Sequence, residues 1–199
     1  MPSVSSTARR RSARLLTEAG APVIVLVLAP LVVSIHAEPS LGSGVGWGLL
    51  AALFFGVIPF GYVLRGVRQG RWSDRHVGTR QQRKPVFFFS LGSMLAGVAI
   101  LAIAGAPRDL VAFLITLLIE AGLALLVTLA WKVSLHAWVA TIGATALVTL
   151  YGIPALILWP FLAGVGWSRV ELEDHTLPQV VVGAVIGTAT TAVLFPLLR

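Results

Sequence analysis

The chain has 199 residues, of which 57% are hydrophobic and 12% are charged, and its formal net charge is +7. This composition excludes an ordinary soluble globular domain and indicates an integral membrane protein. The sequence contains no cysteine, which excludes disulfides and thiolate metal sites, and its length suits one compact helix bundle without a separate soluble domain.

Residues 1–20 are small and basic, and we predict that they form a disordered or surface-lying tail ahead of one membrane-embedded domain over residues 21–199. The arginines of this tail are Arg9, Arg10, Arg11 and Arg14. The alternative is a secretory signal peptide, because a basic start, an apolar stretch and Ala37 together resemble one. Ile35 counts against that alternative, since it is a poor residue two positions before the cleavage site. Either interpretation leaves the tail on the cytoplasmic side.

Apolar runs fill most of the remaining chain, and a helix needs about 20 apolar residues to cross a bilayer. The runs cover roughly residues 21–36, 45–64, 85–104, 109–131, 137–150, 155–166 and 177–198. Pro59 predicts a kink in the second run, and Gly152 and Pro154 predict a turn between the two shortest runs. In the last run, Gly183 and Gly187 allow another helix to approach closely. We therefore predict an all-α, polytopic membrane helix bundle with six to seven transmembrane helices.

Three polar clusters interrupt the apolar runs, one after the second run, one after the fourth and one after the sixth. They cover residues 65–84, 132–136 and 167–179. Successive clusters are separated by one out-and-back hairpin, so all three lie on the face that carries the N-terminal tail. This face carries 13 of the 15 Lys and Arg residues, all except Arg108 and Arg199. The positive-inside rule then predicts a multi-pass cell-membrane protein with this face and the N-terminus in the cytoplasm.

The clusters bring together fixed cations, hydroxyls and histidines at the mouth of an apolar bundle. Their members are Arg75, His76, Arg83, Lys84, Lys132, Ser134, His136, Ser168, Arg169 and His175. Guanidinium groups suit phosphate oxygens, and two histidines can supply a nucleophile or base and an acid. Charges beside membrane segments are costly, which favours a site that binds or transforms a charged ligand over loops that are merely solvated. The pattern is suited to phosphoryl transfer on a ligand whose tail lies in the bilayer.

The third cluster carries the most specific motif. It reads Ser-Arg-x5-His-x3-Gln, with Ser168-Arg169 at its start, His175 in the middle and Gln179 at its end. This pattern resembles Ser-Arg-x5-His-x3-Asp, the third signature of the type 2 phosphatidic acid phosphatase (PAP2) superfamily. The resemblance extends over about residues 45–198 and implies a PAP2-like core within the bundle.

The other two clusters resemble the remaining signatures in the same order along the chain. Residues 133–136, Val-Ser-Leu-His, resemble the second signature, Pro-Ser-Gly-His. The segment from His76 to Arg83, with six residues between them, resembles the first signature, Lys-x6-Arg-Pro. Here His76 stands in place of the lysine, and Lys84 is inserted before Pro85.

The resemblance implies a role for each matched residue. His175 would be the nucleophile that forms a phosphohistidine, His136 the acid that protonates the leaving oxygen, and Gln179 the residue that orients His175. The residues expected to hold the phosphoryl oxygens are Arg83, Arg169, Lys132, Ser134, His76 and, in a supporting role, Ser168. No metal and no other cofactor is implied.

The chain also departs from the family pattern in the second and third signatures. Gln179 replaces an aspartate and gives the imidazole no countercharge. Loss of the orienting carboxylate in a serine-protease triad costs about four orders of magnitude in rate. Glu173 or Asp174 are alternative partners for the histidine. Val133 and Leu135 replace a proline and a glycine, which changes the backbone near the phosphate.

These patterns predict a metal-independent hydrolase of a lipid phosphate or diphosphate, such as a prenyl diphosphate or a phosphatidic-acid-like lipid. One alternative is a catalytically impaired relative that binds lipid phosphates. Another is a terpene synthase-like enzyme that ionises a prenyl diphosphate, although the sequence lacks the paired Asp-rich motifs of such enzymes. The expected partners are the lipid substrate and membrane lipids. No nucleic acid is expected, because membrane flanks account for the positive charge.

Glu120 lies near the middle of the fourth apolar run. A carboxylate at that depth must be paired or protonated. Both a structural hydrogen bond to a neighbouring helix and a substrate role are compatible with the sequence.

Overall fold

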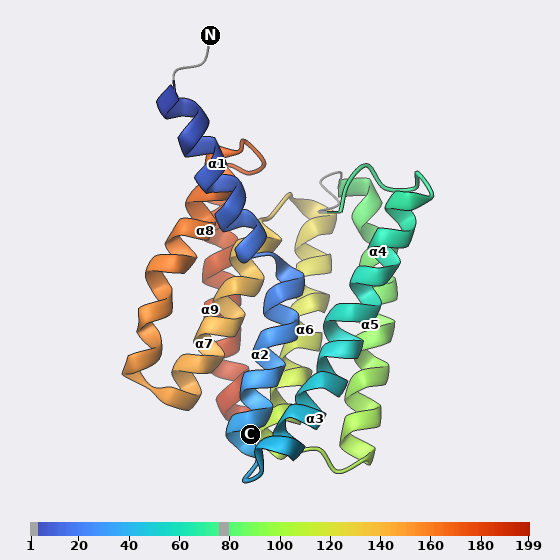
Figure 1. Ribbon diagram of the computed structural model, residues 1–199. Helices are drawn as coiled ribbons and strands as arrows, with labels where there is room; N and C mark the ends of the chain where they lie inside the picture. Colours follow the sequence, from blue (N-terminus) through green and yellow to red (C-terminus); the bar gives the residue numbers. More distant parts are fainter. Residues whose placement is uncertain (1–3, 76–79) are drawn as a thin grey trace.

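The computed structural model describes residues 4–75 and 80–199, which form helices and no strand. The elements are α1 (Val4–Ala19), α2 (Pro22–Ala37), α3 (Leu41–Ala52), the π-helical η1 (Leu53–Val57), α4 (Ile58–Arg68), α5 (Arg80–Ile103), α6 (Arg108–Ala130), α7 (Leu135–Tyr151), the 3-10 helix η2 (Ile153–Leu158), α8 (Trp159–Glu171) and α9 (Leu177–Leu198). Figure 1 shows a bundle of roughly parallel and antiparallel helices with the two termini at opposite ends. The all-α prediction is confirmed.

Several helices are long and apolar enough to span a membrane. Within the described residues, five stretches meet this condition: Leu41–Arg68, Gln81–Ile103, Arg108–Ala130, Ile153–Glu171 and Leu177–Leu198. A sixth is added if α1 and α2, which meet at a bend of 44°, count as one span. The remaining predicted span is α7, whose 17 residues stand at the lower end of the range of about 17–25 for a crossing helix.

The N-terminal segment, predicted as a disordered or surface-lying tail, is helical in the structure. Val4–Ala19 form α1, which lies along α8 at one end of the bundle (Figure 1). Small residues at helical spacing make this contact: Ala13 and Thr17 are buried, and a Cβ on Gly20 would lie 2.5 Å from a methyl group of Val165. These small residues allow α1 to pack against α8.

Helices α7 and α9 pack closely, as the glycine pair predicts. A Cβ on Gly183 would lie 2.7 Å from the backbone oxygen of Ser134, and one on Gly187 would lie 2.6 Å from that of Trp138. Only glycine permits this approach. It places the start of α7 beside the start of α9, where the Ser134 backbone N–H donates to the Gln179 backbone oxygen at 3.1 Å.

Glu120 connects three helices in the interior of the bundle. Its side chain is 1% exposed and accepts hydrogen bonds from Trp138 Nε1 on α7 at 2.7 Å and from Thr191 Oγ1 on α9 at 3.0 Å. Both carboxylate oxygens therefore have donors, as buried polar groups require. This geometry corresponds to the structural hydrogen bond that the sequence left as one of two alternatives.

Replacing Glu120 by Leu should destabilise the fold, because it leaves the Trp138 and Thr191 donors buried without an acceptor. Each unsatisfied group costs about 1–3 kcal/mol, so we expect a loss of at least about 2 kcal/mol in unfolding free energy. Glu120→Gln keeps an acceptor and should cost less. Unfolding in detergent measures the change, with the partly exposed Ile119→Ala as control. A Glu120→Leu variant as stable as the parent would contradict this role.

Candidate functional site

A cavity of about 490 Å³ lies where the three polar clusters meet. All three contribute to its polar lining: Asp74, Arg75 and Arg83 from the first, Lys132 and His136 from the second, and Arg169, Asp174 and His175 from the third. Glu18 of α1 and Ser90 of α5 complete the polar lining. Its other walls are mostly apolar and are contributed by α2, η1, α4, α5 and α7. The prediction that the clusters share one face therefore holds for the described residues. His76 lies outside them.

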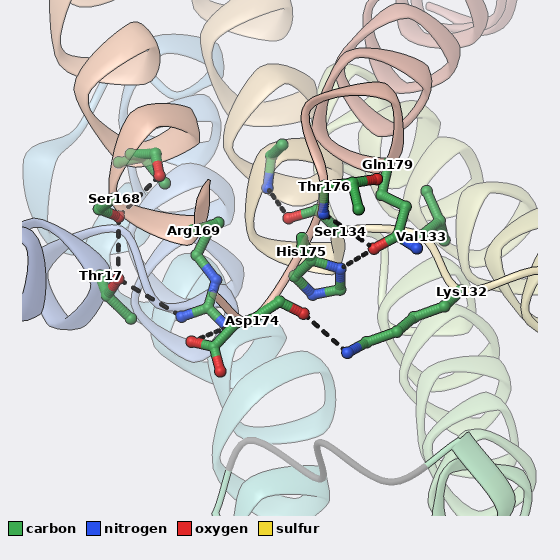
Figure 2. A network of polar contacts seen from close by, with 12 residues as sticks. Thr17, Lys132, Val133, Ser134, Ser168, Arg169, Asp174, His175, Thr176 and Gln179 are labelled. Atoms are coloured by element: carbon green, nitrogen blue, oxygen red, sulfur yellow. Dashed lines mark hydrogen bonds and ion pairs between the residues drawn. The ribbon is translucent and has the colours of Figure 1, made fainter. Parts of the chain in front are cut away.

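His175 is held by the first turn of α9. Gln179 Oε1 accepts a hydrogen bond from the Thr176 backbone N–H at 3.2 Å and lies 3.1 Å from His175 Nδ1. Because a backbone N–H can only donate, the atom that receives it is the amide oxygen. His175 Nδ1 must then be the protonated ring nitrogen, and Nε2 carries the lone pair. The structure thus provides the orienting contact that the sequence assigns to Gln179, as Figure 2 shows.

The two neighbouring carboxylates are engaged elsewhere. Glu173 accepts from Arg10 at 2.8 Å, and Asp174 forms an ion pair with Arg169 at 2.9 Å. The hydrogen-bond partner of His175 Nδ1 is therefore the neutral amide of Gln179, and neither acid takes over the place of the missing aspartate.

The surroundings of His175 keep its ring neutral. Its pKa lies at about 4 instead of the ordinary 6.5, chiefly because burial disfavours the charged form. The hydrogen bond to Gln179 raises the pKa, whereas the positive charges of Lys132, Arg169 and Arg83 lower it. At neutral pH Nε2 of His175, a residue that lines the cavity, is therefore unprotonated, which is the form of imidazole that can act as a nucleophile.

A chain of hydrogen bonds runs from Arg169 into the bundle (Figure 2). Ser168 Oγ donates to the Val165 backbone oxygen at 2.7 Å, so the 2.8 Å contact between Ser168 and Thr17 uses the Thr17 hydroxyl hydrogen. The Thr17 oxygen is then free to accept from Arg169 Nη1 at 3.4 Å. Together with Asp174, this chain fixes a guanidinium that is 5% exposed, and its Nε has no hydrogen-bond partner among the described residues.

Thr17 is a site residue that the sequence prediction missed. It belongs to α1, which was expected to be a tail, and it holds Arg169 directly and Ser168 at the same time. The spacing of Ala13, Thr17 and Gly20 at i, i+4 and i+7 is the signal of a packed helix face that could have identified it.

Backbone contacts join the other cations to the site. Arg83 Nη1 donates to the Val133 backbone oxygen at 3.3 Å, and Lys132 Nζ donates to the Asp174 backbone oxygen at 2.7 Å. These bonds link the first cluster to the second and the second to the third. At the mouth of the cavity Glu18 of α1 forms an ion pair with Arg75 at 2.5 Å, and both residues line the cavity.

The two predicted serines are not among the residues that line the cavity. Ser134 is buried, and its Oγ accepts from the Ala137 backbone N–H at 3.5 Å as the N-cap of α7. Ser168 is buried within the Thr17 chain. Both hydroxyls position neighbouring site residues in this structure. Within the described part of the chain, no group of three or more His, Asp or Glu side chains is arranged to hold a metal ion.

Comparisons with protein-family models, with curated proteins and with solved structures found no match to this chain.

A negative charge at position 179 should raise the pKa of His175. Gln179→Glu keeps the acceptor for Thr176 and places a carboxylate beside Nδ1, which favours the charged ring by about 1–3 pKa units. Histidine NMR titration in detergent measures the shift, with His175→Ala assigning the signal. In the parent protein, the ring should stay neutral as the pH falls from neutrality until it nears the pKa of about 4.

The matched control for this titration is Glu173→Gln, which removes a carboxylate two residues before His175 that is paired with Arg10. It should leave the pKa of His175 nearly unchanged. A pKa of His175 that does not respond to Gln179→Glu would show that Gln179 does not contact the ring.

Proposed function

We propose that this protein is a PAP2-like membrane phosphatase that hydrolyses a lipid phosphate or diphosphate, such as a prenyl diphosphate, without a metal ion. One observation carries the proposal: a neutral, oriented His175 shares a single cavity with His136 and three fixed cations, and the cavity continues between apolar walls. The cations suit phosphate oxygens, and the apolar walls suit a hydrocarbon tail.

The proposed reaction has two steps. His175 Nε2 attacks phosphorus while the bond to the leaving oxygen breaks, and His136 gives that oxygen a proton. Water then attacks the phosphohistidine, and His136 takes the proton from the water. Arg83, Arg169 and Lys132 stabilise the negative charge on the phosphoryl oxygens throughout. Gln179 holds the Nδ1 proton and therefore keeps Nε2 aimed at the cavity.

A second candidate is a lipid-phosphate binder with little turnover. The observation that favours it is the neutral partner of His175 Nδ1, because an amide cannot balance the positive charge that the ring acquires on phosphorylation. The Gln179→Glu variant tests the second candidate. If the missing negative charge limits catalysis, this variant should raise turnover from the very low level that the second candidate implies.

The direct test is phosphate release by the purified protein in detergent without added metal. The panel contains phosphatidic acid, phosphatidylglycerophosphate, and short and long prenyl diphosphates. We expect orthophosphate from one lipid class, and its loss in His175→Ala. His36→Ala is the matched control, because His36 packs against Tyr151 away from the cavity. Full activity of His175→Ala would refute the mechanism, and release of inorganic diphosphate would indicate ionisation of a prenyl diphosphate instead.

Thr17→Val should weaken catalysis by releasing Arg169. The substitution keeps the shape of the side chain and removes the acceptor for a charged donor, an interaction worth about 1.5–3 kcal/mol. We therefore expect kcat/KM to fall about 10- to 100-fold. Thr17→Ser keeps the hydroxyl and should retain most of the parent's kcat/KM. Leu15→Ala, at an exposed position of the same helix, should leave kcat/KM unchanged. Equal losses in the Val and Ser variants would contradict a role for the hydroxyl.

A further inference from the structure

A second cavity of about 110 Å³ adjoins the first and lies deeper in the bundle. Both cavities are lined by Leu26, Phe55, Pro59, Ser90, Leu135 and Val139. The residues that line only the deeper one lie farther from the polar face along α5, α6 and α7. They are Met94, Leu117, Glu120, Ala121, Ala124, Trp138 and Ile142.

The deeper cavity offers a ligand almost no polar contacts. Both oxygens of Glu120 already accept hydrogen bonds from Trp138 and Thr191, and the other lining residues are apolar except Ser90. An apolar cavity of this kind holds water poorly, because water needs two to four polar partners. Its chemistry instead fits a hydrocarbon chain.

The distance from Arg83 to the deeper cavity is similar to the hydrocarbon thickness of one membrane leaflet. Met94 lies 11 residues beyond Arg83 on α5, which is about 16 Å along the helix axis. The hydrocarbon core of a bilayer is about 30 Å thick, so with Arg83 at its edge Met94 would stand near its centre. A ligand with its phosphate at Arg83 would therefore reach the midplane when its tail reaches Met94. Met94 lines the deeper cavity, is 3% exposed and belongs to the hydrophobic core, so the size of its side chain affects the space left for a tail at this level.

The width of the path also limits the ligand. It runs between α2, η1, α5, α6 and α7, and the wide turn of η1 contributes Phe55 to both cavities. The deeper cavity is much smaller than the upper one, at about 110 Å³ against about 490 Å³. Such a constriction suits one chain better than the two acyl chains of a phospholipid.

We propose that the two cavities form one slot for a single-chain lipid phosphate or diphosphate, and that Met94 sets the longest tail that fits. The proposal rests on the phosphate site proposed above and adds to it a substrate class and a residue that determines chain length. Two-chain phosphatidic acid is then a poor ligand.

The test compares the binding of geranyl, farnesyl and geranylgeranyl diphosphate and of phosphatidic acid. Binding is measured as thermal stabilisation in the His175→Ala background, where turnover cannot interfere. Met94→Ala should shift the affinity ratio of longer over shorter tails upward by at least about tenfold, and Met94→Phe should shift it downward. Leu95→Ala is the matched control, because Leu95 is the next residue on α5 and is 59% exposed. Its ratio should equal that of the parent.

Each ratio is taken within one variant, so a loss of stability or yield does not alter it. Unchanged ratios in both Met94 variants would overturn the proposal, as would phosphatidic acid binding as tightly as the prenyl series, or no stabilisation by any prenyl diphosphate. Failure of the proposed catalytic function would appear differently, as lipid binding with the expected dependence on tail length but no phosphate release by the parent protein.

Discussion

Burying charged groups beside an apolar helix bundle costs free energy, and the contacts of Arg169 show how this structure offsets that cost. Its guanidinium is almost fully buried at the end of α8, where it has Asp174 on one side and Thr17 on the other. Ser168 donates its own hydrogen to the Val165 backbone oxygen, so Thr17 donates to Ser168 and accepts from Arg169. Removing any member leaves a buried polar group unsatisfied. Thr17 and Ser168 therefore join α1 to α8 and hold Arg169, which lines the cavity together with Asp174.

Gln179 satisfies two requirements with one oxygen. It caps the first turn of α9 through Thr176 and fixes the tautomer of His175, so the fold of α9 and the orientation of the ring depend on the same side chain. A carboxylate in this place would also supply a countercharge, whereas the amide leaves the ring with a pKa of about 4. The site accordingly offers a well-oriented neutral imidazole and little support for its charged form.

Much of the fold follows from the sequence, because the lengths of apolar runs and the positions of Gly and Pro specify the helices and their turns. The clustering of the three polar segments follows from counting crossings, and the close packing of α7 on α9 follows from Gly183 and Gly187. The packing of α1 on α8 was not predicted from the sequence, because basic residues dominate its composition and make the pattern of small residues that face α8 hard to recognise. The direction of Asp174 and Glu173 could not be predicted either, because adjacent side chains in a loop have no periodicity that fixes where they point.

In the proposed reaction, His175 Nε2 receives the phosphoryl group. The most direct measurement is rapid quenching of the protein during reaction with its best lipid substrate, followed by mass spectrometry under conditions that preserve phosphohistidine. We expect phosphate on His175 that forms and decays at the rate of turnover, and a larger trapped amount when the second step is slowed. Turnover without phosphate on His175, or phosphate on another residue, would contradict it.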